Sequence, residues 1–131
     1  MSMTATATFD VPGWDPAGSD SPEAGPALSR IAIRKAFRGG FEGEGRGEGL
    51  FCGMDAPDVG AGYVVSERLV GRLDGRAGTF VIQHGGLMGP GVPPRTFGNV
   101  VPGSGTGELE GLTGTVEIGE GHTLTLTYDI G

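Results

Sequence analysis

Glycine at alternate positions is the feature that most constrains the fold of this chain, and it is most regular between residues 102 and 115. Glycine occupies positions 103, 105 and 107, and then 111 and 114. Successive side chains of a strand point to opposite faces, so this spacing predicts an extended chain with one bare face for another backbone or a bulky side chain. Gly111 and Gly114 bracket Leu112-Thr113, where we expect a tight turn before a returning strand.

A second strand of this kind is expected from Phe41 to Phe51, where glycine fills positions 43, 45, 47 and 49. The opposite face carries Glu42, Glu44, Arg46, Glu48 and Leu50. Two interpretations remain open. The charged face is solvated, or Glu48, next to Leu50, points into the molecule near its middle. The second interpretation needs a partner for Glu48, because an unpaired buried carboxylate is costly.

The glycine spacing does not indicate a nucleotide site. Neither of the two phosphate-loop fingerprints can be read in residues 102–115, and no amphipathic helix follows to offer its N-terminus to an anion. The formal net charge of −7 disfavours phosphate backbones and anionic membrane surfaces as partners. We therefore expect neither nucleic acid nor a membrane as a partner.

The length of 131 residues predicts one domain, residues 1–131, with an irregular Pro- and Gly-rich loop at 12–27. Trp14 in that loop either covers one end of the domain or stacks on a ligand. The single Cys52 has no internal disulfide partner, which favours a reducing compartment. The first residues lack the basic and apolar regions of a signal peptide, and no apolar run reaches transmembrane length. We expect a cytoplasmic protein.

The remaining chain alternates polar and apolar residues over short runs, with a hairpin turn at Asp74-Gly75-Arg76. Besides the two glycine-rich segments, strands are expected at 4–11, 28–37, 62–73, 78–88, 95–101 and 122–130, with a flexible loop at 85–94. About eight strands at hairpin spacing, with little or no helix, predict an all-β fold: a single antiparallel up-and-down β-barrel. The interior of such a barrel is just large enough for one small ligand.

A polar spot is expected inside this barrel. Glu67 lies in an apolar stripe, and pairing about the hairpin turn brings it close to Gln83 or His84. Burial raises the pKa of a carboxyl group, so Glu67 could move protons near neutral pH. The candidate catalytic residues are Glu67 and His84, with Glu48 joining from the neighbouring strand. The candidate ligand-binding residues are Tyr63, Gln83, Phe80, Tyr128 and Trp14.

Other kinds of site find no support in the sequence. The two histidines are far apart and, with one cysteine, show no metal-ligand spacing, so we expect no metal and no cofactor. His122 is expected in an exposed turn, and a purely structural role for His84 stays open. Lys35 shares a face with Ile33 and Phe37, and we expect its ammonium group to reach solvent at the barrel rim.

Several segments resemble a known family. Gly105-Thr106-Gly107-x-Leu109-x-Gly111-x-x-Gly114, with Val101 to Ser104 before it, is similar to a segment of the allene oxide cyclase-like and dirigent-like β-barrels. It looks like a bacterial family of unknown function, DUF3224, and residues 37–45, 75–84 and 124–129 match as well. The resemblance implies a lipocalin-like antiparallel barrel and no particular activity. The cyclases have an aromatic-rich cavity, whereas this chain has one Trp and two Tyr, so no catalytic residue is transferred.

Three functions are compatible with these expectations. The barrel is a cofactor-free isomerase or cyclase that acts on an apolar small molecule by acid-base chemistry, or a noncatalytic ligand carrier. Alternatively, it is a structural or interaction barrel with a filled interior. We rank binding of a small molecule first; a homo-oligomer, either dimer or trimer, is left open.

Overall fold

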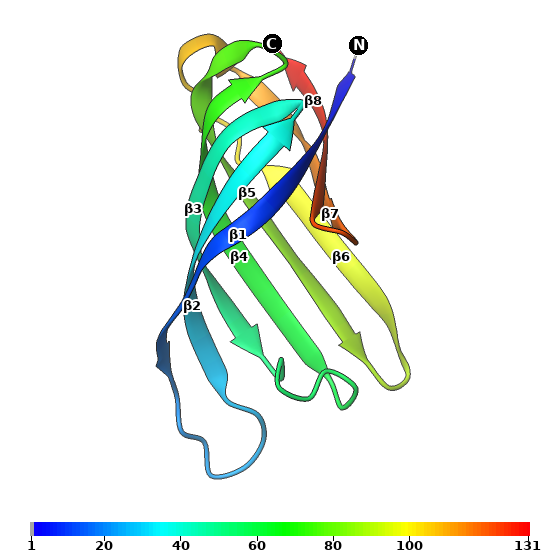
Figure 1. Ribbon diagram of the computed structural model, residues 1–131. Helices are drawn as coiled ribbons and strands as arrows, with labels where there is room; N and C mark the ends of the chain where they lie inside the picture. The colour runs from blue at the N-terminus through cyan, green and yellow to red at the C-terminus, as the bar shows by residue number, and fades with distance from the viewer. Residues whose placement is uncertain (1) are drawn as a thin grey trace.

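The structure, a computed structural model, describes residues 2–131 as eight antiparallel strands in a closed ring, with one short 3-10 turn (Figure 1). Each strand pairs with the next along the chain, and β8 returns to β1. This confirms the predicted all-β barrel. The elements are β1 (Met3–Ser19), β2 (Leu28–Gly39), β3 (Phe41–Cys52), β4 (Ala61–Leu73), β5 (Arg76–Gly89), β6 (Val92–Val100), η1 (Gly107–Leu109), β7 (Leu112–Gly119) and β8 (Thr123–Ile130).

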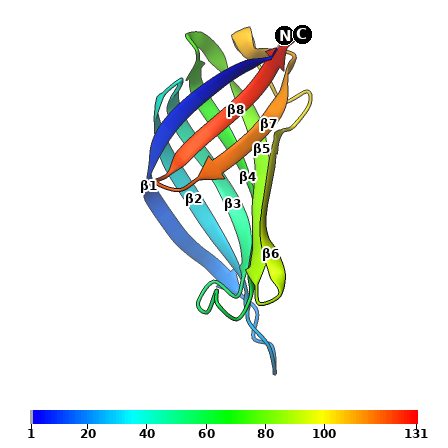
Figure 2. The ribbon, with the colours of Figure 1, turned by 90° about the vertical axis from the view of Figure 1, so that its right-hand side faces the viewer.

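The two ends of the barrel differ, because β7 and β8 are short and lie at the end that holds both termini (Figure 2). We call this the closed end. The opposite end, with the connections 20–27, 53–60 and 90–91, is the open end. β8 pairs with β1 only across residues 3–8, and β6 pairs with β7 only at Asn99 and Thr115. Towards the open end, β1 and β6 therefore each have a strand neighbour on one side only within the described chain.

These two free edges carry prolines, at positions 12 and 16 of β1 and 93 and 94 of β6. Proline cannot donate to a neighbouring strand, so it protects an exposed edge from pairing with another chain. The free edges are consequently poor templates for adding a ninth strand.

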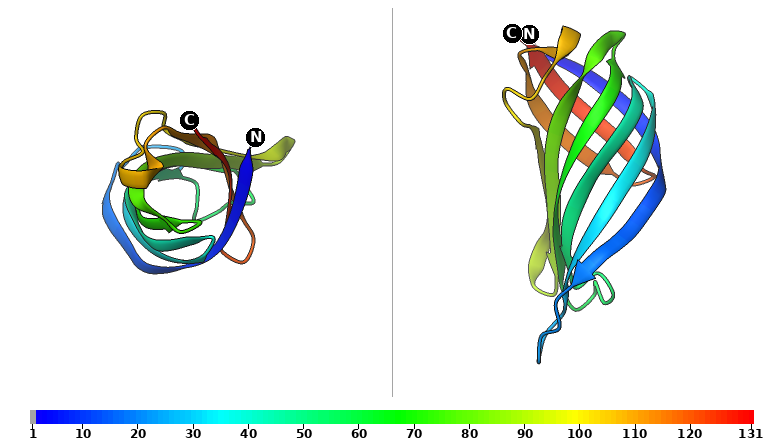
Figure 3. Two further views of the ribbon diagram at one scale, coloured as in Figure 1. Left: turned by 90° about the horizontal axis from the view of Figure 1, so that it is seen from above. Right: turned by 90° about the vertical axis from the view of Figure 1, so that its left-hand side faces the viewer.

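Seen from above, the strands form a ring (Figure 3). Inward-facing side chains form two apolar clusters, one towards each end of this ring. The closed-end cluster is the larger and includes Phe41, Leu69, Phe80, Leu112 and Tyr128, each at most 1% exposed. The open-end cluster consists of Ile31, Ile33, Phe51 and Val65, with Val11 and Tyr63 packed against it. The closed half is therefore filled by its own side chains.

The stretch from 103 to 109 is not a strand, and Leu112-Thr113 begins β7 instead of forming a turn. The chain folds back at Gly111, which has φ +84°, and η1 inserts the fully buried Leu109 into the core. This segment still lies along β5, because the side chains of Ser104 and Thr106 accept hydrogen bonds from the backbone N–H groups of Val81 and Thr79. Two short polar side chains thus take over part of the ladder, beside the backbone hydrogen bond from Thr106 N–H to the Thr79 carbonyl.

β1 is longer than expected, since residues 12–19 continue it and the loop covers only 20–27. A register shift between Asp10 and Gly13 marks a bulge, beyond which Trp14 pairs with Ile33, an inward-facing residue. An inserted residue reverses which side chains face inward, so Trp14 turns towards the barrel opening. Similarly, 85–94 is mostly strand, in β5 and β6. Among the described residues, no helix has the length and apolar character needed to cross a membrane.

Candidate functional site

Lys35 and Glu67 meet inside the barrel although β3 lies between the strands that carry them. The inner face of β3 carries no side chain where they cross it, because Gly45 is the register partner of Lys35 and Gly47 that of Glu67. A Cβ atom on Gly45 would lie 2.9 Å from Glu67 Oε1, and one on Gly47 would lie 2.6 Å from Glu67 Cβ. The alternate glycines of β3 therefore provide the space for this ion pair.

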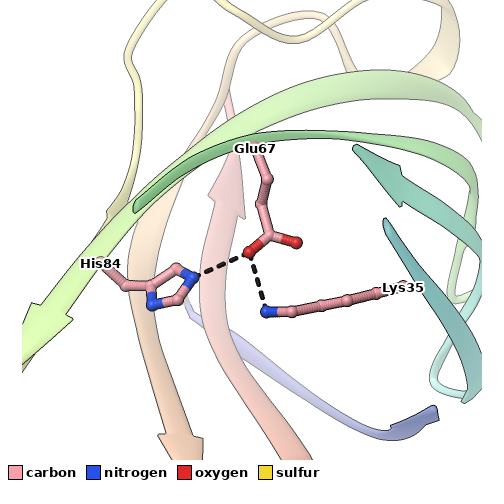
Figure 4. Close-up of polar contacts among 3 residues, drawn as sticks. All are labelled: Lys35, Glu67 and His84. Carbon is pink, nitrogen blue, oxygen red and sulfur yellow. Dashed lines mark hydrogen bonds and ion pairs between the residues drawn. The ribbon is translucent and has the colours of Figure 1, made fainter. Parts of the chain in front are cut away.

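Two polar side chains, those of Lys35 and His84, converge on one carboxylate oxygen of Glu67 (Figure 4). Lys35 Nζ lies 2.9 Å from Glu67 Oε2, and His84 Nε2 lies 2.8 Å from the same atom. Lys35, Glu67 and His84 are 7%, 2% and 5% exposed, and they are the buried polar or charged residues of the described chain. This cluster lies among the apolar residues of both ends.

The pKa of Glu67 is lowered, contrary to the expectation that burial raises it. Burial alone would raise the pKa of Glu67, but the hydrogen bond from His84 and the charge and hydrogen bond of Lys35 outweigh it, so the pKa lies below its ordinary value. Lys35 was expected at the barrel rim, yet its ammonium group lies in the interior. The positive charge of Lys35 offsets the negative charge of Glu67, which makes burial of the pair tolerable.

The partner of His84 Nε2 determines the tautomer. An ionised carboxylate only accepts hydrogen bonds, so Nε2 carries the proton and donates it to Glu67 Oε2. In a neutral ring, Nδ1 is then an acceptor, and it is fully buried without any protein partner. Glu67 Oε1 also lacks a partner, but it faces the Gly45 wall, beside the Phe37 ring. Of these two unpartnered atoms, Glu67 Oε1 is the one that lies against β3.

Aromatic rings separate the cluster from the open end. Tyr63 lies with its ring edge-on to His84 at 6.1 Å and stacks on Phe51 at 5.4 Å, and Trp14 contacts the outer side of Phe51 at 5.1 Å. Phe51 is buried, Tyr63 is half-buried, and Trp14 is 51% exposed. We call Trp14, Phe51 and Tyr63 the aromatic layer.

Two hollows flank this layer and share Met54. The larger, of about 590 Å³, is lined by Trp14, Ile31 and Phe51 among others, and the smaller, of about 140 Å³, is lined by Tyr63, Gly86 and Met88 among others. A third hollow, of about 340 Å³ beside Arg30 and Glu48, lies on the outer face of the sheet and does not reach the cluster.

The structure brings together Glu67, His84 and Tyr63 of the expected site residues, with Trp14 at the opening. Phe80 and Tyr128 instead belong to the closed-end cluster. Gln83 and Glu48 point outward. Gln83 donates a hydrogen bond to Ser66, and Glu48 is exposed near Arg30 at 3.8 Å. Placing Glu48 in the interior was wrong, because it alternates with the inward-facing glycines of β3.

Sequence reasoning missed Lys35 as a member of the cluster. A signal was present, since Lys35 shares its strand face with Ile33 and Phe37, both expected to point inward. An inward-facing lysine and an inward-facing glutamate at the level of a bare glycine strand indicate a buried pair. Recognising it requires the register between β2, β3 and β4, which the sequence alone does not provide.

Comparisons with known proteins agree on one family. A family model described as "Protein of unknown function (DUF3224)" matches residues 5–130. A crystal structure of a DUF3224 protein of unknown function from Shewanella oneidensis MR-1 is 38% identical, with a TM-score of 0.85, and the match covers 100% of this chain and 99% of that chain. A search of curated proteins found no match.

Proposed function

The chain belongs to the DUF3224 family, and we propose that it binds a small, mainly apolar molecule at the open end and exchanges a proton with it through His84. The observation that carries this proposal is the buried His84 Nδ1, which has no protein partner although the opposite ring nitrogen is held by a carboxylate. Buried polar atoms are normally hydrogen-bonded, so an unpartnered one behind the aromatic layer, whose rings line two hollows, suggests a ligand site.

The arrangement of the cluster suits general acid-base chemistry. A proton taken by Nδ1 makes His84 an imidazolium ion, which the ionised Glu67 stabilises through Nε2, as the carboxylate of a catalytic triad does for its histidine. Lys35 keeps Glu67 ionised and therefore able to accept the hydrogen bond from His84 Nε2–H. If the proton returns to another atom of the ligand, the net reaction is an isomerisation, which needs no oxidant, reductant or second substrate.

The aromatic layer provides the apolar part of the binding surface. Its rings lie between His84 and the two hollows, so a bound molecule contacts Phe51 and Tyr63 before it reaches Nδ1. Tyr63 must move for direct contact, and as a half-buried residue beside a hollow it has space to do so. Binding is confined to the open half because the closed-end cluster is filled.

Deuterium exchange tests the proton transfer with a simple probe. The ketone 2-tetralone has an apolar ring system and acidic C–H bonds, and NMR follows its deuterium uptake from D2O. We expect the protein to accelerate uptake over buffer, and His84→Gln to lose about tenfold or more of that acceleration, because a positioned base typically contributes about 10²–10⁴-fold.

The matched control is Glu48→Gln, which changes an exposed carboxylate on the outer face and should leave the uptake rate unchanged. Glu67→Gln should reduce uptake while keeping 2-tetralone bound. Equal rates with protein and with buffer, despite binding of the ketone at the open end, would reject catalysis and favour a noncatalytic carrier. Absence of binding there would count against the whole proposal.

A further inference from the structure

We infer that the ligand of this site is an uncharged molecule that donates a hydrogen bond from a hydroxyl, enol or N–H group to His84 Nδ1, and that carboxylates and phosphates are excluded. The inference rests on the proposed binding at the open end and names the class of ligand. The ligand class follows from the buried hydrogen-bonding atoms of the cluster that have no protein partner.

The unpartnered ring nitrogen of His84, which lies behind the Tyr63 ring, is an acceptor. Glu67 Oε2 already receives two hydrogen bonds, from Lys35 and from His84. With the Nε2 proton committed to Glu67, Nδ1 of the neutral ring presents a lone pair. A hydroxyl group satisfies this lone pair, whereas a carboxylate or phosphate would place a second acceptor against it.

The positive charge of Lys35 is not directed at the open end. Its ammonium group contacts Glu67 and lies 4.7 Å from the centre of the Phe9 ring, which belongs to the closed-end cluster. Glu67 and Lys35 cancel in charge, so the cluster supplies no net attraction for an anion that has lost its water. As long as the His84 ring is neutral, a buried anion would therefore lack both a hydrogen-bond donor and a counter-charge.

The larger hollow and the net charge of the chain do not favour anions either. The larger hollow has Asp55 as its one charged lining residue, and the whole chain carries a net charge of −7. Arg95 is the one charged residue that lines the smaller hollow, beside its register partner Leu87, which is 51% exposed. The long-range field of the protein consequently disfavours an approaching anion.

Three probes with the same ring system test the inference: 2-naphthalenemethanol, its methyl ether and 2-naphthoate. NMR titrations of the labelled protein measure each dissociation constant and show whether the shifts fall on Tyr63 and on the His84 ring. We expect the alcohol to bind about tenfold more tightly than the ether and the carboxylate, a difference of about 1.4 kcal/mol, because these two leave a buried polar group unpaired.

The outcomes separate the ligand class from the site. If the ether or the carboxylate binds as tightly as the alcohol, with shifts at Tyr63 and His84, the ligand class is wrong and the binding site stands. If none of the probes shows saturable shifts at the open end, the proposed function fails and this inference fails with it. These comparisons use the unmodified protein, so they do not depend on any variant folding.

A variant locates the source of the discrimination. His84→Gln offers both a donor and an acceptor, so the preference for alcohol over carboxylate should fall to about threefold or less. The matched control is Gln83→Ala, which alters the neighbouring outward-facing residue of β5 and should keep the preference. Retention of the full preference in His84→Gln, with an unchanged backbone spectrum, would contradict recognition through Nδ1.

Discussion

Lys35 Nζ and Glu67 Oε2 lie 2.9 Å apart in the interior of the barrel, although their strands, β2 and β4, are not neighbours. The intervening strand, β3, presents Gly45 and Gly47 at the two register positions. Any larger residue there would occupy the space in which the two side chains meet. The glycine spacing and the buried ion pair are thus two parts of one structural feature.

The close approach at Gly47 predicts that even one added carbon is harmful. A Cβ atom there would lie 2.0 Å from the backbone oxygen of Ser66 and 2.6 Å from Glu67 Cα, neither of which can move aside freely. We expect Gly47→Ala to lower the free energy of unfolding by about 1–3 kcal/mol or more, the range for overpacking. Gly119→Ala is the control, because its Cβ would contact only the rotatable Thr123 hydroxyl. Equal urea midpoints for both variants would contradict the close approach.

Removing one partner of the ion pair should be severe. Lys35→Met leaves the Glu67 carboxylate buried with only His84, and breaking a buried pair in this way typically costs about 3–5 kcal/mol. The double variant Lys35→Met, Glu67→Met removes both charges and should recover part of the loss. Arg30→Met, at the exposed pair with Glu48, is the control, with an expected effect of about 0–1 kcal/mol. Urea denaturation measures these variants together with the single Glu67→Met, and additive effects of the two buried substitutions would argue against the pair.

The lowered pKa of Glu67 predicts how stability depends on pH. Its folded-state pKa lies below the ordinary value of 4.5, so the unfolded chain binds the proton more readily. The stabilisation is therefore fully present above pH 4.5 and is lost as the pH falls through the folded-state pKa. Glu67→Gln should lack this contribution. The difference in unfolding free energy between the two proteins should shrink on acidification, and a constant difference would contradict the lowered pKa.

Much of the fold could be predicted because alternation determines which side chains share a face. The inward positions of Glu67 and His84 follow from period-two patterns and from the turn at Asp74-Gly75, which sets the register of β4 against β5. Glu48 was harder to assign, because a face of alternating glycines leaves it open whether the glycines or the charges point inward. Its position is decided by the neighbouring strands, whose Lys35 and Glu67 need the bare face.

Other features escaped prediction because they depend on tertiary contacts. Residues 103–109 have the glycine spacing of a strand, yet burial of Leu109 and the hydrogen bonds of Ser104 and Thr106 to β5 give them another conformation. Trp14 faces the opening because of a bulge in β1.

Tyr128 should contribute to stability at the closed end, not to ligand binding. Its hydroxyl group donates a hydrogen bond to Asp74 in the turn between β4 and β5. Burial, followed by this hydrogen bond and the charge of Asp74, raises the pKa of Tyr128 to about 12. We expect Tyr128→Phe to cost about 1 kcal/mol, since Asp74 is exposed, and to leave the binding of 2-naphthalenemethanol unchanged. A loss of that binding would place the ligand at the closed end.

The last prediction concerns the route by which His84 becomes accessible. The Tyr63 ring lies edge-on to His84 and borders a hollow, whereas Phe80 lies in the closed-end cluster. Tyr63→Ala should therefore speed exchange of the His84 Nε2 proton with water by about tenfold or more beyond what its loss of global stability explains. NMR measures this exchange, because the hydrogen bond to Glu67 makes the proton slow enough to observe.

Phe80→Leu is the control, since it also weakens the core but does so at the other end of the barrel. Its effect on the exchange of the His84 proton should follow the change in global stability alone. Val64→Ala, on the exposed outer face of the same strand as Tyr63, should have no effect. If Tyr63→Ala and Phe80→Leu accelerate the exchange equally at matched stability, the aromatic layer is not the barrier between His84 and solvent, and a ligand would have to reach Nδ1 by another route.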